Sequence, residues 1–482
     1  MKKGYHAYIN INNLESILKT EEQKTDKLKK AFHQLDTYVA SIENAVKRYA
    51  EIAEVEKLTA SRIHIYFVGK DTDEKLQRKL FETLALSYYL ADFVSTKISK
   101  YNNVADYGVA IGVDYGNFTL FNFEDEESGI EEQTSIGSPA NRAAKLQSYT
   151  ESGRISISNN VYDALISDIK RLFFGRSQIT LEVAKKYADL TAYDCALSEL
   201  HEFFNGTEYV RHCQQAGQFA YERAMSTDIS EVVFSKARHK VDYSKLSLRN
   251  NKELEGIMVF ADIRGFTRKF DPEGKNLPAM KVATQKILKA MHDCVIAEDG
   301  VHVQFQGDRI SAFFHEYEGE EQDYIIRAYK CALSFLDAVT SLNREPDVRI
   351  ALGSDKLCLG VGCANGTIYA TRVGLKNNKD NIAMGETVRM ADYAEDNIAG
   401  VGIEARKSEI AVTSNCYALL TVSKEPLSKK IKGCFRKRGN HYICETSLNS
   451  IIGQEMERVE RNNYEEAKTA TTVRPWSRDH HI

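Results

Sequence analysis

The feature that most constrains the fold is a repeat: the order of predicted elements in the first half of the chain recurs in the second. Period-two runs predict strands and amphipathic runs predict helices. The first half gives strand 5–11, helix 21–57, strand 62–68, helix 74–100, a hairpin of 104–113 and 117–123, a helix from about 139, strand 154–158 and helix 159–168. The second half gives strand 256–263, helix 277–293, strands 301–305 and 310–314, helix 322–342, a strand beginning at 348–353, a helix from about 387 and strand 409–414. One recurrence with a period of roughly 250 residues indicates that a whole domain is duplicated.

The length of 482 residues agrees with this, because one core stops growing well below that size. We expect a first domain at 1–195, a helical connector at 196–250, a second domain at 251–450 and a charged tail at 451–482. The connector is amphipathic at 196–240 and lacks the Gly, Ser and Pro of a flexible linker. Mixed strands and helices in each half predict an α+β fold.

Composition excludes several classes of protein. A net charge of −4 argues against a nucleic-acid binder, which would carry a basic excess. No apolar run is long enough to span a membrane, and the N-terminus has no signal-peptide core. The nine cysteines are scattered without a CxxC pair, which is typical of reduced thiols in the cytoplasm.

The sharpest segment for chemistry is residues 259–267, VFADIRGFT. A buried strand ends at Asp262 and turns through Gly265 into a helix. An aspartate at a strand end suits a divalent cation, and the amides that follow, at Phe266 and Thr267, suit a phosphate chain. The alternative is that Asp262 is simply a helix N-cap.

A second aspartate lies in residues 304–309, QFQGDR, in a tight turn between two strands. Asp308 alone would be an ordinary turn residue. Carboxylates from two adjacent strands, however, can hold two Mg²⁺ ions and stabilise both oxygens of a phosphoryl transfer. Found together, Asp262 and Asp308 favour a metal site.

These two segments, FADIRGFT and then GD 46 positions later, resemble the metal-binding pair of the class III adenylyl and guanylyl cyclases. The resemblance covers both halves of the chain. It implies two ferredoxin-like domains packed head to tail as a pseudo-heterodimer, with the active site between them. It further implies Asp262, Asp308 and the Ile263 carbonyl as ligands of two Mg²⁺ or Mn²⁺ ions.

The family also has a partner loop, G-x-x-V-N-x-A-x-R, which supplies a transition-state Asn and Arg. The second half has Arg389 and Tyr393 at those positions, so the resemblance implies that it does not supply this half-site. The first half has Asn141 at the Asn position and Lys145 at the Arg position. Asn141 is expected to position the ribose, and Lys145 to balance charge on the α-phosphate; the alternative for Lys145 is a solvated helix residue.

The first half, in contrast, lacks acidic residues at the positions that correspond to Asp262 and Asp308. Alignment of its strands places Asn10 where the first aspartate belongs and Lys70 where the second belongs. An ammonium group is incompatible with a divalent cation at that point. Each half therefore keeps what the other has lost, which predicts one active site per chain.

The base-selecting positions of the first half are Tyr66 and Thr134, where adenylyl and guanylyl cyclases carry other residues. A tyrosine here resembles the bacterial pyrimidine cyclases of the Pycsar anti-phage systems. Its hydroxyl can bond a pyrimidine edge, although Tyr66 could also be a core aromatic. Thr134 can donate or accept, so CTP and UTP both remain open.

The leading hypothesis is thus a cytoplasmic cyclase that makes cCMP or cUMP from a nucleoside triphosphate, as a signal to a cyclic-nucleotide effector in defence against phage. The alternatives are an adenylate cyclase that makes cAMP, and a catalytically inactive nucleotide-binding sensor. No nucleic-acid or membrane partner is expected. One chain contains both half-sites, so either a monomer or a homodimer is compatible with catalysis.

Overall fold

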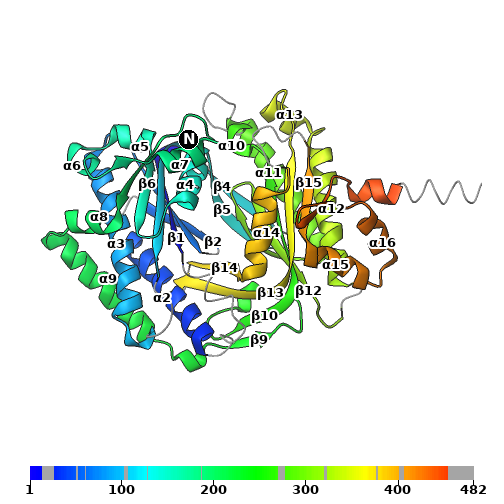
Figure 1. Cartoon of the computed structure of the whole chain (residues 1–482), viewed down its shortest axis with the longest axis horizontal. Helices are drawn as coiled ribbons and strands as arrows, with labels where there is room; N and C mark the ends of the chain where they lie inside the picture. The colour runs from blue at the N-terminus through cyan, green and yellow to red at the C-terminus, as the bar shows by residue number, and fades with distance from the viewer. Residues whose placement is uncertain are drawn as a thin grey trace, which may run out of the picture.

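The computed structural model describes residues 1–12, 26–49, 53–59, 61–101, 107–126, 129–185, 187–269, 277–319, 323–375, 378–400 and 407–453. Two mixed sheets lie side by side, one built mainly from each half of the chain (Figure 1). The strand order is β2-β3-β1-β4-β6-β8-β7 in the first sheet and β11-β12-β10-β13-β15-β17-β16 in the second. Strand for strand these are the same order, so the described residues confirm the duplicated α+β organisation.

The elements of the first half were predicted from short periodic runs, and most are found. The first half of the structure contains β1 (Lys2–Ile11), α2 (Asp26–Tyr49), β2 (Ala53–Thr59), β3 (Arg62–Val68), α3 (Glu74–Thr96), β4 (Val109–Asp125), β5 (Ile130–Ile136), α4 (Ser138–Tyr149), β6 (Arg154–Ser158), α5 (Asn159–Ala164), α6 (Ser167–Lys170), β7 (Phe174–Gly175), α7 (Ser177–Ala184) and β8 (Ala192–Ala196). Of these, β2, β5, β7, α7 and β8 were not predicted.

The second half repeats this pattern after a connector. The connector holds α8 (Leu197–Phe203), α9 (Thr207–Met225) and β9 (Phe234–Lys236). Then follow β10 (Asn251–Ile263), α10 (Phe266–Lys269), α11 (Leu277–Ala297), β11 (Val301–Gln306), β12 (Arg309–His315), α12 (Tyr324–Leu342), α13 (Pro346–Leu352), β13 (Leu359–Leu375), β14 (Asn378–Met384), α14 (Glu386–Asn397), β15 (Glu409–Thr413), α15 (Ser414–Val422), α16 (Pro426–Gly433), β16 (Arg436–Arg438) and β17 (His441–Cys444).

Three predicted elements are wrong. The helix expected at 21–57 ends at Tyr49, and 53–59 is strand β2. The hairpin expected around Tyr115 and Gly116 is one continuous strand, β4, because β1 pairs with it through both residues. The strand expected from 348 is instead helix α13, where Pro346 begins the first turn, a position that needs no N–H donor.

Glycines mark where helix and sheet approach closely in both halves. A Cβ on Gly112 of β4 would collide with the Ala143 carbonyl of α4. A Cβ on Gly362 of β13 would collide with the Ala391 carbonyl of α14. These matching contacts align the two halves residue by residue, so positions in one sheet can be compared with positions in the other.

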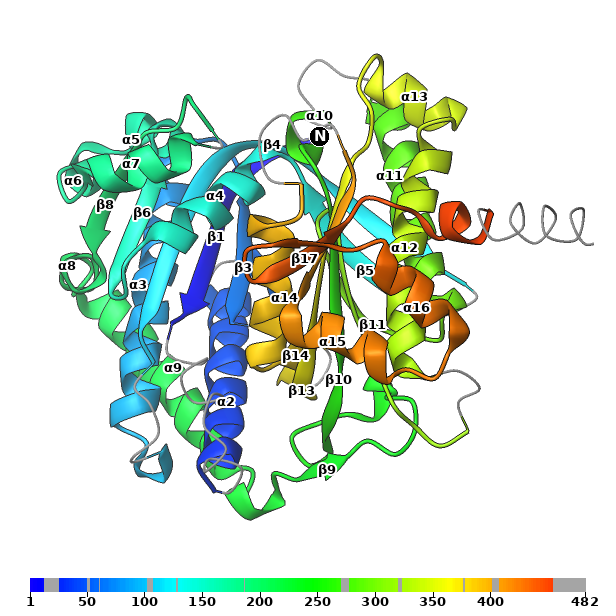
Figure 2. The ribbon, with the colours of Figure 1, turned by 45° about the vertical axis from the view of Figure 1, so that its right-hand side comes forward.

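The long strands β4 and β13 extend beyond their own sheets, and each buries side chains in the other half's core. Phe121, Phe123 and Ile136 belong to the core of the second half. In return, Tyr369, Val373, Ile382 and Met384 belong to the core of the first. Figure 2 shows β5 reaching toward β11 and α12, and β13 and β14 ending beside α2. The two domains therefore interlock.

The connector helix α9 packs against α2 and α3, on the outer face of the first sheet. No helix among the described residues is long and apolar enough to cross a membrane. The exact domain boundaries of the sequence analysis stay a prediction.

Candidate active site

Asp262 and Asp308 lie on neighbouring strands of the second sheet. Asp262 is the penultimate residue of β10 and stands opposite Arg309, the first residue of β12. Asp308 immediately precedes Arg309, in the turn between β11 and β12, where Gly307 adopts a φ of 69° that favours glycine. The antiparallel pairing of β10 with β12 thus brings the two aspartates to the same edge, as the sequence predicted.

Two arginines and a buried glutamate surround Asp262. Arg264 Nη1 lies 3.3 Å from Asp262 Oδ2 and 2.5 Å from Glu395 Oε1. Arg309 Nη2 lies 2.9 Å from Glu395 Oε2 and 2.5 Å from Asp392 Oδ1. Burial raises the pKa of Glu395 to about 7, although both arginines oppose this shift. Two acidic residues of α14, Asp392 and Glu395, therefore hold these arginines in place beside Asp262.

These donors fit a divalent cation. Carboxylate and carbonyl oxygens are the ligands that Mg²⁺ and Mn²⁺ prefer. The Asp262 side chain is 24% exposed, so its oxygens are accessible from the edge of the sheet. Across the described ranges, no group of three or more His, Cys, Asp or Glu residues is arranged to hold a metal. A metal here would thus rest on two carboxylates, the Ile263 carbonyl and oxygens of the substrate.

The first half places helix α4 on the same side. α4 lies against α10, the short helix that follows Asp262. From α4, Lys145 Nζ reaches to 3.7 Å from Asp396 Oδ2 of α14 and 5.1 Å from the centre of the Tyr149 ring. Asn141 is one turn earlier on the same helix. The structure thus brings the predicted Asn141 and Lys145 to the boundary with the domain that carries Asp262 and Asp308.

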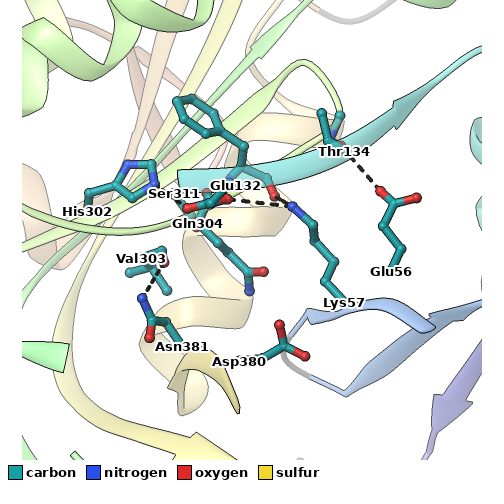
Figure 3. A network of polar contacts seen from close by, with 12 residues as sticks. Glu56, Lys57, Glu132, Thr134, His302, Val303, Gln304, Ser311, Asp380 and Asn381 are labelled. Atoms are coloured by element: carbon teal, nitrogen blue, oxygen red, sulfur yellow. Dashed lines mark hydrogen bonds and ion pairs between the residues drawn. The ribbon is translucent and has the colours of Figure 1, made fainter. Parts of the chain in front are cut away.

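Thr134 joins the two halves directly. Its Oγ1, on β5, accepts a hydrogen bond from Gly307 N at 3.0 Å and donates one to Glu56 Oε1 at 3.3 Å. Figure 3 shows Thr134 between Glu56 and the turn of the second half. The predicted base-reading residue therefore touches the turn that carries Asp308.

Tyr66 is placed differently from Thr134. It is 1% exposed on β3, its hydroxyl donates to Glu54 of β2, and its ring lies 5.5 Å from that of Phe118. Burial raises the pKa of this hydroxyl, and the bond to Glu54 adds to the shift. This placement favours the core interpretation of Tyr66 that the sequence left open.

Phe266 and Thr267 both fall in α10. Phe266 is 4% exposed and packs in the core of the second half, so its side chain is structural. The side chain of Thr267 lies outside the described residues. The phosphate contacts expected here would come from backbone amides.

The degenerate metal positions of the first half need one correction. Asn10 pairs with Ala110 just as Asp262 pairs with Gly360, so Asn10 does stand at the first position. The second position is not Lys70, which is exposed beyond the far end of β3. It is Ser61, because Arg62 pairs with Asn10 as Arg309 pairs with Asp262.

Ser61 and Asn10 are bonded to each other. Ser61 Oγ donates to Asn10 Oδ1 at 2.8 Å, so a neutral pair replaces the two carboxylates. In the second half, Arg389 pairs with Glu386, and Tyr393 is 48% exposed. The two halves therefore differ at equivalent positions, with Ser61 where the sequence analysis placed Lys70, and the complementarity of the half-sites stays a prediction.

Sequence reasoning missed Lys57 and Glu132. Lys57 lies on β2, which was taken as the end of a helix, and Glu132 lies on β5, which was not predicted as a strand. The repeat contained a signal for β2: strands β11 and β12 flank the turn that holds Asp308, so a strand should also precede the equivalent turn before Arg62.

The chain is similar in sequence to known nucleotide cyclases. No family model matches the chain. It is 25% identical over 451 residues to a uridylate cyclase of Pseudomonas aeruginosa, covering 90% of this chain and 80% of that one. It is 22% identical over 405 residues to a uridylate cyclase of a Rhizobium species, covering 78% of this chain and 72% of that one.

A solved structure has the same fold over nearly the whole chain. It is a class III adenylyl cyclase-like ATP-binding protein from Pseudomonas aeruginosa, with a TM-score of 0.65 and 21% identity, covering 94% of this chain and 90% of that one. The match extends over both sheets, so it includes the tandem arrangement.

Proposed function

We propose that this chain is a pyrimidine nucleotide cyclase of the class III type, because it is similar over most of its length to two uridylate cyclases and has the tandem fold of a class III adenylyl cyclase-like protein. It converts UTP or CTP to the 3′,5′-cyclic monophosphate and pyrophosphate. The observation that carries the proposal is the composite site, in which the turn that holds Asp308 contacts Thr134 of the other domain, and α10, which follows Asp262, contacts α4. The names of both curated relatives favour UTP over CTP and ATP.

In this reaction the ribose 3′-oxygen forms a bond to the α-phosphorus, the bond from that phosphorus to the β-phosphate bridging oxygen breaks, and the 3′-hydroxyl proton passes to solvent. Asp262, Asp308 and the Ile263 carbonyl would hold divalent ions. When bound, such ions supply Lewis acidity and neutralise the triphosphate.

The first domain would orient the nucleotide. Asn141 positions the ribose. Lys145, which lies 3.7 Å from Asp396 in this structure, leaves that partner and binds the α-phosphate oxygens, on which charge develops. Thr134 contacts the base. The Glu56 carboxylate beside it is ionised, because His64, with Lys57 and Ser135, outweighs the effect of burial and lowers its pKa. The Thr134 proton therefore points to Glu56, and Gly307 N occupies one lone pair of its oxygen. The remaining lone pair can accept from the ring N–H of uracil, which cytosine lacks, so this contact favours UTP.

We also propose that the product acts as a second messenger in antiviral defence, read by a cyclic-nucleotide effector, as the resemblance to the Pycsar cyclases implies. The reaction would then take place in the cytoplasm, where nucleoside triphosphates are abundant.

The direct test is to incubate the purified chain with Mg²⁺ or Mn²⁺ and each ribonucleoside triphosphate in turn, and to identify products by mass spectrometry. We expect a cyclic pyrimidine nucleotide, lost in both Asp262→Ala and Asn141→Ala. Cyclic AMP as the main product would overturn the pyrimidine assignment while keeping the mechanism. The absence of any cyclic product would favour a nucleotide-binding sensor.

A further inference from the structure

The strand that leads into Asp308 is held by the opposite domain. Glu132 Oε2, on β5, accepts a hydrogen bond from Phe305 N of β11 at 2.7 Å. Lys57 Nζ, on β2, donates to Phe305 O at 2.6 Å. Both backbone groups of Phe305 are thus bonded to the first domain, three residues before Asp308. Figure 3 shows the two side chains involved, Lys57 and Glu132.

Glu132 is itself fixed in place. Its Oε1 lies 2.8 Å from His302 Nε2, and its Oε2 lies 3.5 Å from Lys57 Nζ. Burial alone would raise the pKa of this carboxyl, but Lys57, His302 and the Phe305 amide together hold it below its ordinary value. Glu132 is therefore an ionised acceptor, and bonds to charged acceptors are roughly twice as strong as neutral ones.

The same arrangement recurs with the domains exchanged. Asp380 Oδ2, on β14, accepts from Leu58 N at 2.8 Å, and Gln304 Nε2 donates to Leu58 O at 3.2 Å. Leu58 precedes Ser61 just as Phe305 precedes Asp308. The contacts to Phe305 therefore hold the strand before the turn with Asp308. The equivalent contacts to Leu58 hold the strand before the turn with Ser61, which has no carboxylate.

We propose that Glu132 is a positioning residue that sets Asp308 from the opposite domain by fixing the backbone of Phe305. The metal site is then complete only when the two domains are docked in this register. This inference rests on the proposed function, because it takes Asp308 as a metal ligand. Glu132 acts through Phe305, and it is not proposed to touch metal or substrate.

The two exchanged contacts supply a matched pair of variants. Glu132→Ala removes the acceptor on the metal side, and Asp380→Ala removes the equivalent acceptor on the side of Ser61. Both delete one carboxylate that bonds a backbone amide across the same interface. A merely structural role would therefore affect both variants alike, whereas positioning of Asp308 affects only the first.

We would titrate Mn²⁺ by electron paramagnetic resonance at pH 8, with 2′,3′-dideoxy-UTP as a ligand that cannot be cyclised, and in parallel measure the Mn²⁺ dependence of cyclisation. Glu132→Ala should weaken Mn²⁺ binding about ten-fold and raise the half-maximal Mn²⁺ concentration equally, because it removes a charge-assisted bond. Asp380→Ala should stay within about two-fold of the parent. Glu132→Gln, whose amide oxygen still accepts from Phe305 N, should recover most of the loss.

Equal shifts in Glu132→Ala and Asp380→Ala, or no shift in Glu132→Ala, would overturn the proposal. If Glu132→Ala does not fold, as judged by circular dichroism, Glu132→Asp takes its place, because its shorter side chain withdraws the carboxylate from Phe305 N. Asp308→Ala is the reference for a lost metal ligand. A parent protein that binds Mn²⁺ through Asp308 but makes no cyclic nucleotide would refute the proposed function and leave this inference standing.

Discussion

At the scale of single residues, the site depends on which groups carry charge and where they point. Asp262 and Asp308 are acidic residues in a sequence context that predicts their role, and the structure brings them to one edge of a sheet. The first domain has the neutral residues Asn10 and Ser61 at the same two positions. The two domains therefore differ by one substitution at each of these two positions.

Lys145 gives a prediction at this scale. Replacement by Ala should lower kcat about 100-fold with little change in KM, because the ammonium group stabilises charge that develops only in the transition state. Lys145→Arg should retain most activity, since it keeps the charge. Steady-state kinetics on the preferred triphosphate measure both. An unchanged kcat in Lys145→Ala would mean that this residue is only a partner of Asp396.

At the scale of elements, the long strands β4 and β13 matter most, because each completes the other domain's core. Their tips are also held by polar contacts. Lys289 of α11 lies 2.9 Å from Asp125 at the end of β4. Asp36 and Glu43 of α2 accept from the amides of Gly374 and Leu375 at the end of β13. Neither domain is therefore expected to fold fully without the other.

A core residue on β4 tests this interlocking. Phe123 is 1% exposed and its ring lies 4.7 Å from that of Phe305 in the second domain. Phe123→Ala should lower the free energy of unfolding by about 3–5 kcal/mol, as for other buried aromatics. Asn122→Ala, exposed on the same strand, should change it by less than about 0.5 kcal/mol.

Chemical denaturation followed by both fluorescence and circular dichroism would measure these effects. We expect one shared transition in the parent and in both variants, because the cores are exchanged. Two separate transitions in the parent would contradict the interlocked arrangement.

At the scale of the whole molecule, buried charge between the domains links stability to pH. Burial raises the pKa of Asp380 to about 7, although the Leu58 amide and Lys57 oppose the shift. The folded state therefore binds a proton at this carboxyl more tightly than the unfolded state does. The contribution of Asp380 to stability is full at pH values below about 4 and falls as pH rises toward 7.

Asp380→Asn should remove this dependence, because the amide is neutral at every pH and can still accept from Leu58 N. The difference in Tm between Asp380→Asn and the parent should grow in favour of the variant between pH 5 and pH 8. Differential scanning calorimetry across that range gives the result. A constant difference would show that Asp380 is ionised in the fold throughout.

Much of this architecture was accessible from the sequence, and the errors have physical causes. Strand β2 was missed because Glu56 and Lys57, whose side chains are buried, are charged, which is rare at buried strand positions. They are tolerated there because each finds a partner across the sheet or the domain interface, such as His64 for Glu56. Lys70 was assigned wrongly because the strand at 62–68 was aligned with β11, whereas it corresponds to β12. Aligning the wrong strand of a hairpin shifts every equivalent position.

The sequence by itself determined the duplication and the α+β class, and it singled out Asp262 and Asp308 as candidate metal ligands, because these follow from local periodicity and from short motifs. Only the tertiary structure decided which residues of the first domain face them. Thr134 bonds to Gly307, and Glu132 to Phe305, across 173 positions in the chain. Such contacts depend on strand register and on how the two domains dock, and no local pattern of residues specifies either.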